Sequence, residues 1–342
     1  MKNLGEFELI ARLTQGLHAP ATVVQSVGDD CALLDVGGKE LLLATCDSQV
    51  EGVHFTLQTS TSEQIGRKAL AINLSDIAAM GGVPRYALVS LILPAQLSLT
   101  LLDGIYAGLH AEAQEFATAI VGGNISGAGK GELLIIDITL LGTVERGHAL
   151  LRSGARPGDR LFVTGTIGDS AAGLHTLLHP DAGYPQGAQR FVQERHLVPR
   201  PRIAEGRILS RFGPAIVTAM LDISDGLSGD LGHICERSHT GARIELAHLP
   251  LSPALQTIAQ QAKHDPYRWA LHGGEDYELL FTADPAYERQ VIEAIQEETG
   301  TAVTCIGTIC EVQDGMKLVH PDGHEEPLSV KSWDHLKAED NM

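Results

Sequence analysis

The sequence has no run of about 20 consecutive apolar residues, so we expect no membrane-spanning helix. Cysteines are few and odd in number, five in all, and none forms a CxxC pair. This argues against a disulfide framework or a zinc site, and we expect buried or partly buried free thiols. The first residues, MKNLGEFELIARL, carry acids where a secretory signal has its apolar centre. That pattern predicts a cytoplasmic protein.

Positive charge is also scarce. Lysine and arginine number 25 against 43 aspartates and glutamates, which leaves a net charge of −18. Such a chain repels phosphates at long range, so we expect no nucleic-acid partner and no anionic membrane surface. If this protein handles phosphates, it needs cations to do so.

The length of 342 residues and a hydrophobic content of 44% predict two folded domains, each with its own core. A loop rich in Gly, Arg and Pro at 145–158 indicates the boundary, and we divide the chain into 1–148 and 149–342. Both halves mix strands and helices, so the predicted fold class is mixed α/β. Strands are expected at 41–45, 86–93, 133–144, 160–165, 217–223, 242–246, 277–283 and 303–309. Helices are expected at 62–80, 98–118, 169–178, 188–197, 201–212, 227–239, 252–263 and 285–298.

Three helix starts carry local signals. Ser62 is in position to cap the first helix, and Thr100 with Asp103 has capping-box spacing in the second. Pro285 suits the first turn of the last helix.

Several aspartates stand where an ionised side chain is costly, beside glycines or at the ends of apolar strands. On a helix, Asp76 shares a face with Asn73 in the apolar run LAINLSDIAAM. A structural polar network is one explanation, and metal ligation is the one that we favour. Carboxylates without His or Cys select hard cations, Mg²⁺ first, which shares its coordination with substrate phosphates.

Other features allow phosphate contact but do not require it. The glycine-rich segment 122–127 could wrap a phosphate or form a tight turn, and 165–169 could be a helix N-terminal anion site or a plain turn. Arg67, Lys68 and Arg152 are basic candidates for phosphate binding or for solvated surface positions. No P-loop, protein-kinase signature or GxSxG elbow is present.

Six segments in order resemble the thiamine-monophosphate kinase family. They are VGDDCA (27–32), NLSDIAAMG (73–81), VGGN (121–124), RSGARPGD (152–159), DISDGL (222–227) and GGEDYEL (273–279). The resemblance extends from Gly5 to about His335. It implies a PurM-like two-domain fold, with an N-terminal mixed sheet that binds ATP and Mg²⁺ and forms a homodimer. A C-terminal α/β domain would complete the nucleotide and substrate site.

The same resemblance implies transfer of the γ-phosphoryl group of ATP to thiamine monophosphate, with several Mg²⁺ ions. The implied metal ligands are Asp30, Thr45, Asp47, Asp76, Asn124, Asp222 and Asp225. The implied nucleotide contacts are Tyr106, Gly123, Asn124, Arg152 and Ser224, and the implied substrate contacts are His54, Glu275 and Trp333. No general base is expected, because the acceptor phosphate oxygen is already anionic.

Two alternatives stay open at the level of the sequence. One is another ATP-dependent enzyme of the same superfamily, such as an aminoimidazole ribonucleotide synthetase. The other is a non-catalytic Mg-nucleotide sensor, which would need the site to have lost ligands.

Overall fold

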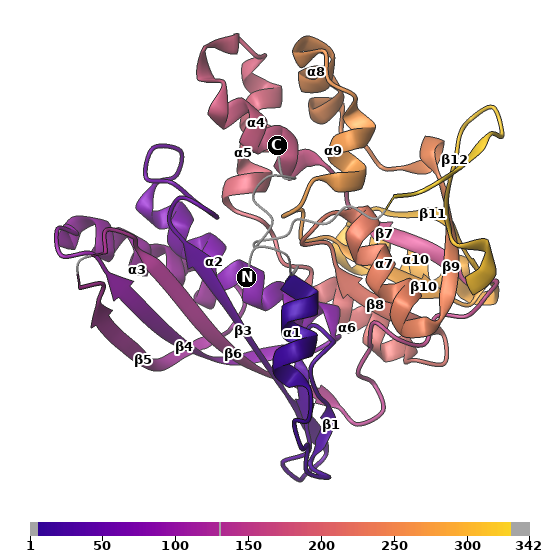
Figure 1. Ribbon diagram of the computed structural model, residues 1–342, viewed down its shortest axis with the longest axis horizontal. Helices are drawn as coiled ribbons and strands as arrows, with labels where there is room; N and C mark the ends of the chain where they lie inside the picture. Colours follow the sequence, from indigo (N-terminus) through magenta and orange to yellow (C-terminus); the bar gives the residue numbers. More distant parts are fainter. Residues whose placement is uncertain (1–5, 130, 330–342) are drawn as a thin grey trace.

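The computed structural model describes residues 6–129 and 131–329 of the chain. Within them, two sheets are built from successive stretches of sequence (Figure 1). The first half contains α1 (Glu6–Thr14), β1 (Val23–Gln25), β2 (Ala32–Leu34), β3 (Glu40–Val50), α2 (Ser62–Ala79), β4 (Val83–Leu93), α3 (Leu99–Glu115), β5 (Ala119–Gly127) and β6 (Ile135–Glu145). Its six strands run in the order β1-β2-β3-β6-β4-β5, and all neighbours are antiparallel except β4 and β5.

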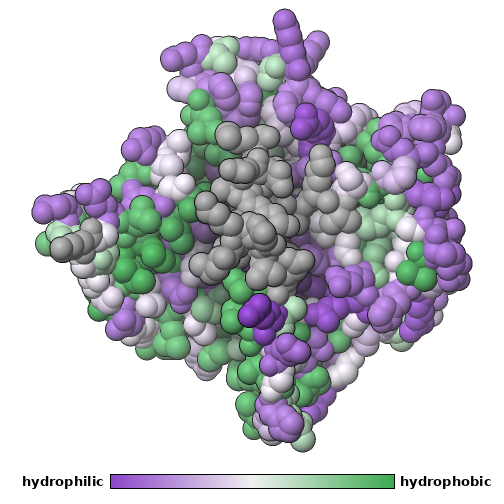
Figure 2. Space-filling view, viewed as in Figure 1, coloured by the Kyte–Doolittle hydropathy of each residue, from purple (hydrophilic) through white to green (hydrophobic). Residues whose placement is uncertain are grey.

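Helices α2 and α3 cover one face of this sheet. Alternate residues of β4, Ala87, Val89 and Leu91, are buried in one core with apolar residues of both helices. The other face of β4 carries Tyr86 and Leu88, which are 52% and 41% exposed. Figure 2 shows apolar residues on the surface of this lobe, coloured green.

The second half forms a seven-stranded sheet in the order β13-β12-β9-β11-β7-β10-β8. Its strands are β7 (Arg160–Thr164), β8 (Val217–Asp222), β9 (Thr240–Glu245), β10 (Leu279–Ala283), β11 (Val303–Glu311), β12 (Met316–Val319) and β13 (Glu325–Pro327). Its helices are α4 (Asp169–Leu178), α5 (Gln186–Leu197), α6 (Ile203–Phe212), α7 (Leu227–Ser238), α8 (Pro253–Ala262), α9 (Pro266–His272) and α10 (Glu288–Thr299).

This second sheet is covered on both faces, which explains why every residue of β8 is buried. One core joins alternate sheet residues to α7 and α9, and the other joins the intervening residues to α6 and α10. Ala78 and Ala79 at the end of α2 belong to the second of these cores. Helix α2 therefore packs against both sheets, and it lies between them in Figure 1.

Most predicted elements are present, with ends shifted by a few residues, but three local predictions were wrong. Thr61, not Ser62, caps α2, in a reciprocal capping box with Gln64. Ser98 caps α3 through the Leu101 N–H, so Thr100 and Asp103 do not form its box. Pro285 begins a short 3₁₀ turn, and α10 starts only at Glu288.

The glycine-rich segment 122–127, predicted as a loop, is strand β5. A Cβ on Gly123 would lie 1.7 Å from the Val89 carbonyl oxygen of β4, so glycine permits this close strand approach. Elements α1, β1, β2, α9, β12 and β13 had no matching prediction. All of these elements are short, and a short segment gives too few residues for its apolar periodicity to stand out.

Two predictions from composition can be compared with the described residues. None of their helices is long and apolar enough to cross a membrane. All five cysteines are free thiols, as predicted, but Cys46 is exposed rather than buried. It lies on the face of β3 that α2 and α3 do not cover, beside Thr139 and Asp137 of β6.

Candidate active site

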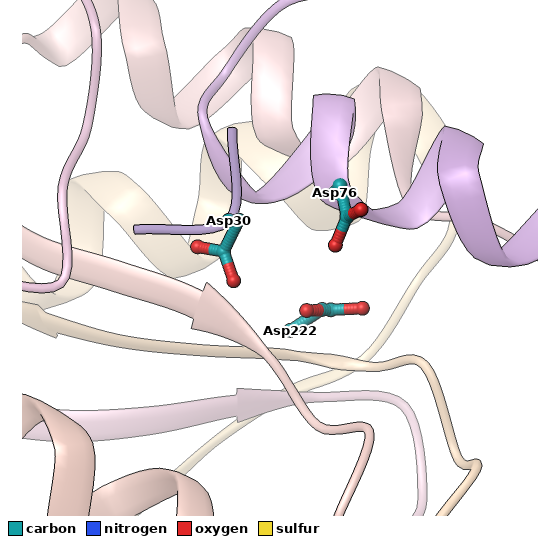
Figure 3. A group of neighbouring side chains, drawn as sticks. All are labelled: Asp30, Asp76 and Asp222. Carbon is teal, nitrogen blue, oxygen red and sulfur yellow. The ribbon is translucent and has the colours of Figure 1, made fainter. Parts of the chain in front are cut away.

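Three aspartates from separate segments converge between the two sheets. Asp30 lies just before β2, Asp76 lies in α2, and Asp222 ends β8. One carboxylate oxygen from each lies within 4.8 Å of the others, as Figure 3 illustrates. Three hard oxygen donors at this spacing, without a nitrogen or sulfur ligand, suit a cation such as Mg²⁺.

Each carboxylate of this aspartate cluster is held by a polar partner. The Thr45 hydroxyl donates to Asp76, and Ser75 Oγ donates to Asp222 Oδ2 at 2.5 Å. Arg152 donates to Asp30 Oδ1 through Nε at 3.1 Å and Nη2 at 2.6 Å. The second oxygen, Asp30 Oδ2, is buried and has no hydrogen-bond partner within the described part of the chain. A buried carboxylate oxygen without a donor is a ready ligand position for a cation.

Burial and mutual repulsion raise the proton affinity of these carboxyls. Burial, with the Asp30 charge added, raises the pKa of Asp222 to about 7. Burial and the carboxylates of Asp47 and Asp222 raise the pKa of Asp76. Burial likewise raises the pKa of Asp29, next to the cluster, to about 7. A bound cation would reverse this effect, because it favours the ionised form.

Asp47 of β3 lies beside the cluster, and burial raises its pKa as well. Its backbone N–H donates to Asn73 Oδ1 at 3.1 Å, while Asn73 Nδ2 donates to the Ala69 carbonyl at 3.2 Å. Asn73 is fully buried and joins α2 to β3. The shared helix face of Asn73 and Asp76 thus combines both explanations, a polar network at Asn73 and a candidate metal ligand at Asp76.

A second group of polar side chains, centred on Glu275, contacts α2 at Lys68. Glu275 Oε1 is 2.8 Å from Lys68 Nζ, and Lys68 Nζ also donates to the His54 carbonyl at 3.4 Å. Two predicted substrate contacts, His54 and Glu275, are therefore neighbours of the same lysine. Lys68 is 3% exposed, so it is not a solvated surface lysine, and in this structure its ammonium group pairs with Glu275.

The loop that carries Glu275 is bonded to the loop that follows Asp222. The Glu275 N–H donates to the Ser224 carbonyl at 2.7 Å, and the Tyr277 N–H donates to the Ile223 carbonyl at 2.9 Å. Glu275 has a φ of 67°, a left-handed conformation that is strained for a residue with a side chain. The candidate metal loop and the candidate substrate loop thus hold each other in place.

A network of buried ion pairs at Glu278 holds the same loop in place. Glu278 is fully buried and accepts hydrogen bonds from Arg195, Arg202 and Thr164. It connects α5, the start of α6 and β7 to the Glu275 loop. These contacts join residues far apart in sequence, so no local pattern indicated them.

The remaining predicted site residues lie on other elements or in the loop that follows Asp222. Tyr106 of α3 packs against the first core, and Gly123 and Asn124 lie on the exposed edge strand β5. Asp225 is at the loop after β8, where its N–H donates to Asp230 Oδ2 at 3.1 Å. Trp333 lies outside the described residues.

Two proposed phosphate contacts are occupied by the protein itself. Arg67 bonds to Glu112 and Glu115 of α3. The start of α4 is capped by Asp276, whose carboxylate accepts from the Gly168 and Ser170 N–H groups.

Side chains that complete the site but had no assigned role are Ser75, Asp29 and His196. Ser75 could have been noticed, because it adjoins Asp76 in the same apolar helix.

Family models, curated proteins and solved structures each include relatives of this chain. The family model described as "AIR synthase related protein, N-terminal domain" matches residues 28–144, and its C-terminal counterpart matches residues 156–318. Thiamine-monophosphate kinase of Salmonella typhimurium is 37% identical over 97% of this chain and 98% of its own length. The Bacillus subtilis enzyme of the same name is 36% identical over 98% and 100%. A solved structure of AaThiL complexed with AMPPCP and TMP has a TM-score of 0.84, with 36% identity and 98% coverage of both chains.

Proposed function

The chain belongs to the thiamine-monophosphate kinase family, and we propose that its aspartate cluster holds the Mg²⁺ ions that the reaction uses. The protein is a kinase that transfers the γ-phosphoryl group of ATP to thiamine monophosphate, giving thiamine diphosphate and ADP. Its two-domain PurM-like fold is the one that the sequence motifs implied.

The observation that supports the metal proposal is the convergence of Asp30, Asp76 and Asp222 within 4.8 Å. Asp30 Oδ2, which has no hydrogen-bond partner among the described residues, and the raised pKa of Asp222 both fit a position for a cation. We propose that Thr45, Asp47, Asn124 and Asp225 complete the metal ligands. When bound, Mg²⁺ would offset the repulsion between the two phosphates and stabilise the transferring group.

We propose a direct, in-line transfer in which no side chain acts as a general base. The nucleophile is an oxygen of the acceptor phosphate, which is already ionised, so no proton must be removed. The protein then has to bring two anions together and align them. Arg152, which is held by Asp30 in this structure, supplies a guanidinium for the nucleotide phosphates.

We assign Tyr106, Gly123, Asn124, Arg152 and Ser224 to the nucleotide and His54, Glu275 and Trp333 to the acceptor. Residues 1–148 would then bind ATP and Mg²⁺ and form the dimer, and residues 149–342 would complete the site. For His54 and Glu275, the support is their common neighbour Lys68.

We propose a homodimer that forms through the open face of the first sheet. Tyr86 and Leu88 expose apolar side chains there, opposite the face covered by α2 and α3. A partner on this face would bury them, at about 25 cal/mol for each Å² removed from water. We also propose a cytoplasmic location, where ATP is available and five free thiols stay reduced.

The direct test is ADP release by the purified full chain with ATP and Mg²⁺, with and without thiamine monophosphate. We expect ADP and thiamine diphosphate in equal amounts, only when the acceptor is present. ADP formed only with a formylglycinamidine ribonucleotide would indicate a synthetase of the superfamily. Binding of Mg-ATP without any turnover would indicate a sensor.

A further inference from the structure

Lys68 makes a buried ion pair that joins the two halves of the molecule. Its side chain is 4% exposed, and that of its partner Glu275 is 25% exposed. Lys68 lies on α2, whereas Glu275 lies just before β10 of the second sheet. At this depth, a charged group without a partner is costly, so the two side chains depend on each other.

His196 also contacts this pair but does not share the charge. Its Nδ1 is 3.3 Å from Glu275 Oε2 and 3.0 Å from Ser170 Oγ. Burial, with the Lys68 charge added, lowers the pKa of His196 to about 4, so the ring is neutral near pH 7. Lys68 therefore neutralises Glu275, and His196 adds only a polar contact to its second oxygen.

The spacing along α2 relates this pair to the aspartate cluster. Lys68 and Ser75 are seven residues apart, so they face the same side of the helix, about 10 Å apart. Lys68 bonds to Glu275, and Ser75 bonds to Asp222. One helix thus contacts two carboxylates of the second half, through side chains about 10 Å apart along its axis.

We infer that Lys68 is a positioning residue for the acceptor, which neutralises Glu275 and orients it to accept hydrogen bonds rather than to balance a cation. This inference rests on the proposed assignment of Glu275 to the acceptor. The acceptor has two chemically different rings, a cationic thiazolium and a neutral aminopyrimidine that donates N–H hydrogen bonds. A carboxylate already paired with a lysine attracts a second cation weakly, whereas it still accepts hydrogen bonds. Glu275 would therefore recognise the aminopyrimidine end.

The test is a double-mutant cycle with Lys68→Met, Glu275→Gln and the double variant, in the full chain with Mg-ATP. The measurements are the Michaelis constants for thiamine monophosphate and for ATP, kcat, and the melting temperature. Lys68→Met should raise the acceptor constant about tenfold, equivalent to about 1.4 kcal/mol, and leave the ATP constant within about twofold. The double variant should resemble Glu275→Gln alone, because Lys68 acts through Glu275. Lys68→Arg, which keeps the charge, should recover most of the acceptor affinity.

Arg67→Met is the matched control, because Arg67 adjoins Lys68 but bonds only to Glu112 and Glu115 in the described contacts. It should leave both Michaelis constants unchanged.

Additive effects in the cycle, or equal changes in both constants for Lys68→Met, would overturn the inference. If Glu275→Gln raises the acceptor constant and Lys68→Met does not, only the role of Lys68 is refuted. An unchanged constant in Glu275→Gln would refute the role of Glu275 as well. If Lys68→Met fails to fold, the double variant can still be measured, because it has no unpaired charge. The inference then requires two results: the double variant has the acceptor constant of Glu275→Gln, and Lys68→Arg keeps most of the acceptor affinity of the wild type.

Discussion

Asp76→Asn should stabilise the metal-free protein while it lowers turnover by roughly 10²-fold or more. The carboxylate oxygens of Asp30, Asp76 and Asp222 lie within 4.8 Å of one another. Two unit charges at that separation repel by about 3.5 kcal/mol at an effective dielectric constant of 20. Asp76 faces two such neighbours, although proton uptake by the cluster relieves part of this repulsion.

Asparagine removes the charge but keeps an oxygen that can accept from Thr45. The lost charge-assisted part of that hydrogen bond costs about 1 kcal/mol. We therefore expect a net gain of about 2–4 kcal/mol at about pH 8 without metal, after allowing for partial protonation. Each kcal/mol corresponds to roughly 2–4 °C in the melting temperature of a domain of this size.

The assay is thermal unfolding in EDTA and again with Mg-ATP, together with kcat. The wild-type protein should gain about 2.7 kcal/mol at a hundredfold excess of ligand over its dissociation constant, and Asp76→Asn should gain much less. Turnover should fall by roughly 10² or more, as a loss of about 3 kcal/mol in transition-state stabilisation requires.

Asp159→Asn is the control, because Asp159 is buried and accepts from the Arg156 N–H and Thr218 Oγ1 but lies outside the cluster. It should lose stability and keep its response to Mg-ATP. If Asp76→Asn melts no higher than the wild type in EDTA, and retains both turnover and the Mg-ATP response, the reasoning about the cluster is wrong.

Three further predictions concern the same site. Asp30→Asn and Asp225→Asn should each fold and lose about 10²-fold or more in turnover, partly restored by higher Mg²⁺; normal rates at low Mg²⁺ would contradict their role as ligands. The pKa of Asp222 is raised from 3.8 to about 7, so its contribution to metal-free stability is lost as the pH rises through about 7. The increase in melting temperature caused by Mg²⁺ should therefore grow as the pH rises toward about 7, by up to about 1.4 kcal/mol per pH unit for one displaced proton, and level off above it. In Asp222→Asn this growth should be smaller, and what remains comes from the raised pKa values of Asp29, Asp47 and Asp76. His196 titrates in both the metal-free and the metal-bound protein, so it cancels in this difference. Trp333→Ala should raise the Michaelis constant for thiamine monophosphate roughly threefold to thirtyfold and leave that for ATP unchanged, if the ring stacks on the acceptor. A lower melting temperature with an unchanged acceptor constant would mean that Trp333 only anchors the end of the chain.

The sequence was sufficient for much of the fold and for the kind of chemistry. Strong apolar runs such as 217–223 predict buried strands, because apolar burial is expressed locally. A carboxylate in such a run is conspicuous, since an ionised group is costly to bury without a partner. Asp76 and Asp222 could therefore be singled out from their immediate neighbours. Motif order then indicated the family, which the comparisons confirm.

What the sequence could not indicate is which side chains meet. Ser75 and Asp222 are separated by 147 positions and yet share a hydrogen bond. Arg67 and Lys68 are adjacent and have the same charge, but Arg67 bonds to α3 of the first half and Lys68 bonds to Glu275 of the second half. Segment 122–127 became a strand because β4 provides a hydrogen-bonding partner, and no local glycine pattern reveals that partner. Local sequence specifies the periodicity of apolar residues and shows where burial of a charge is costly. Pairings across the chain depend instead on how α2 packs between two sheets whose strands come from distant segments.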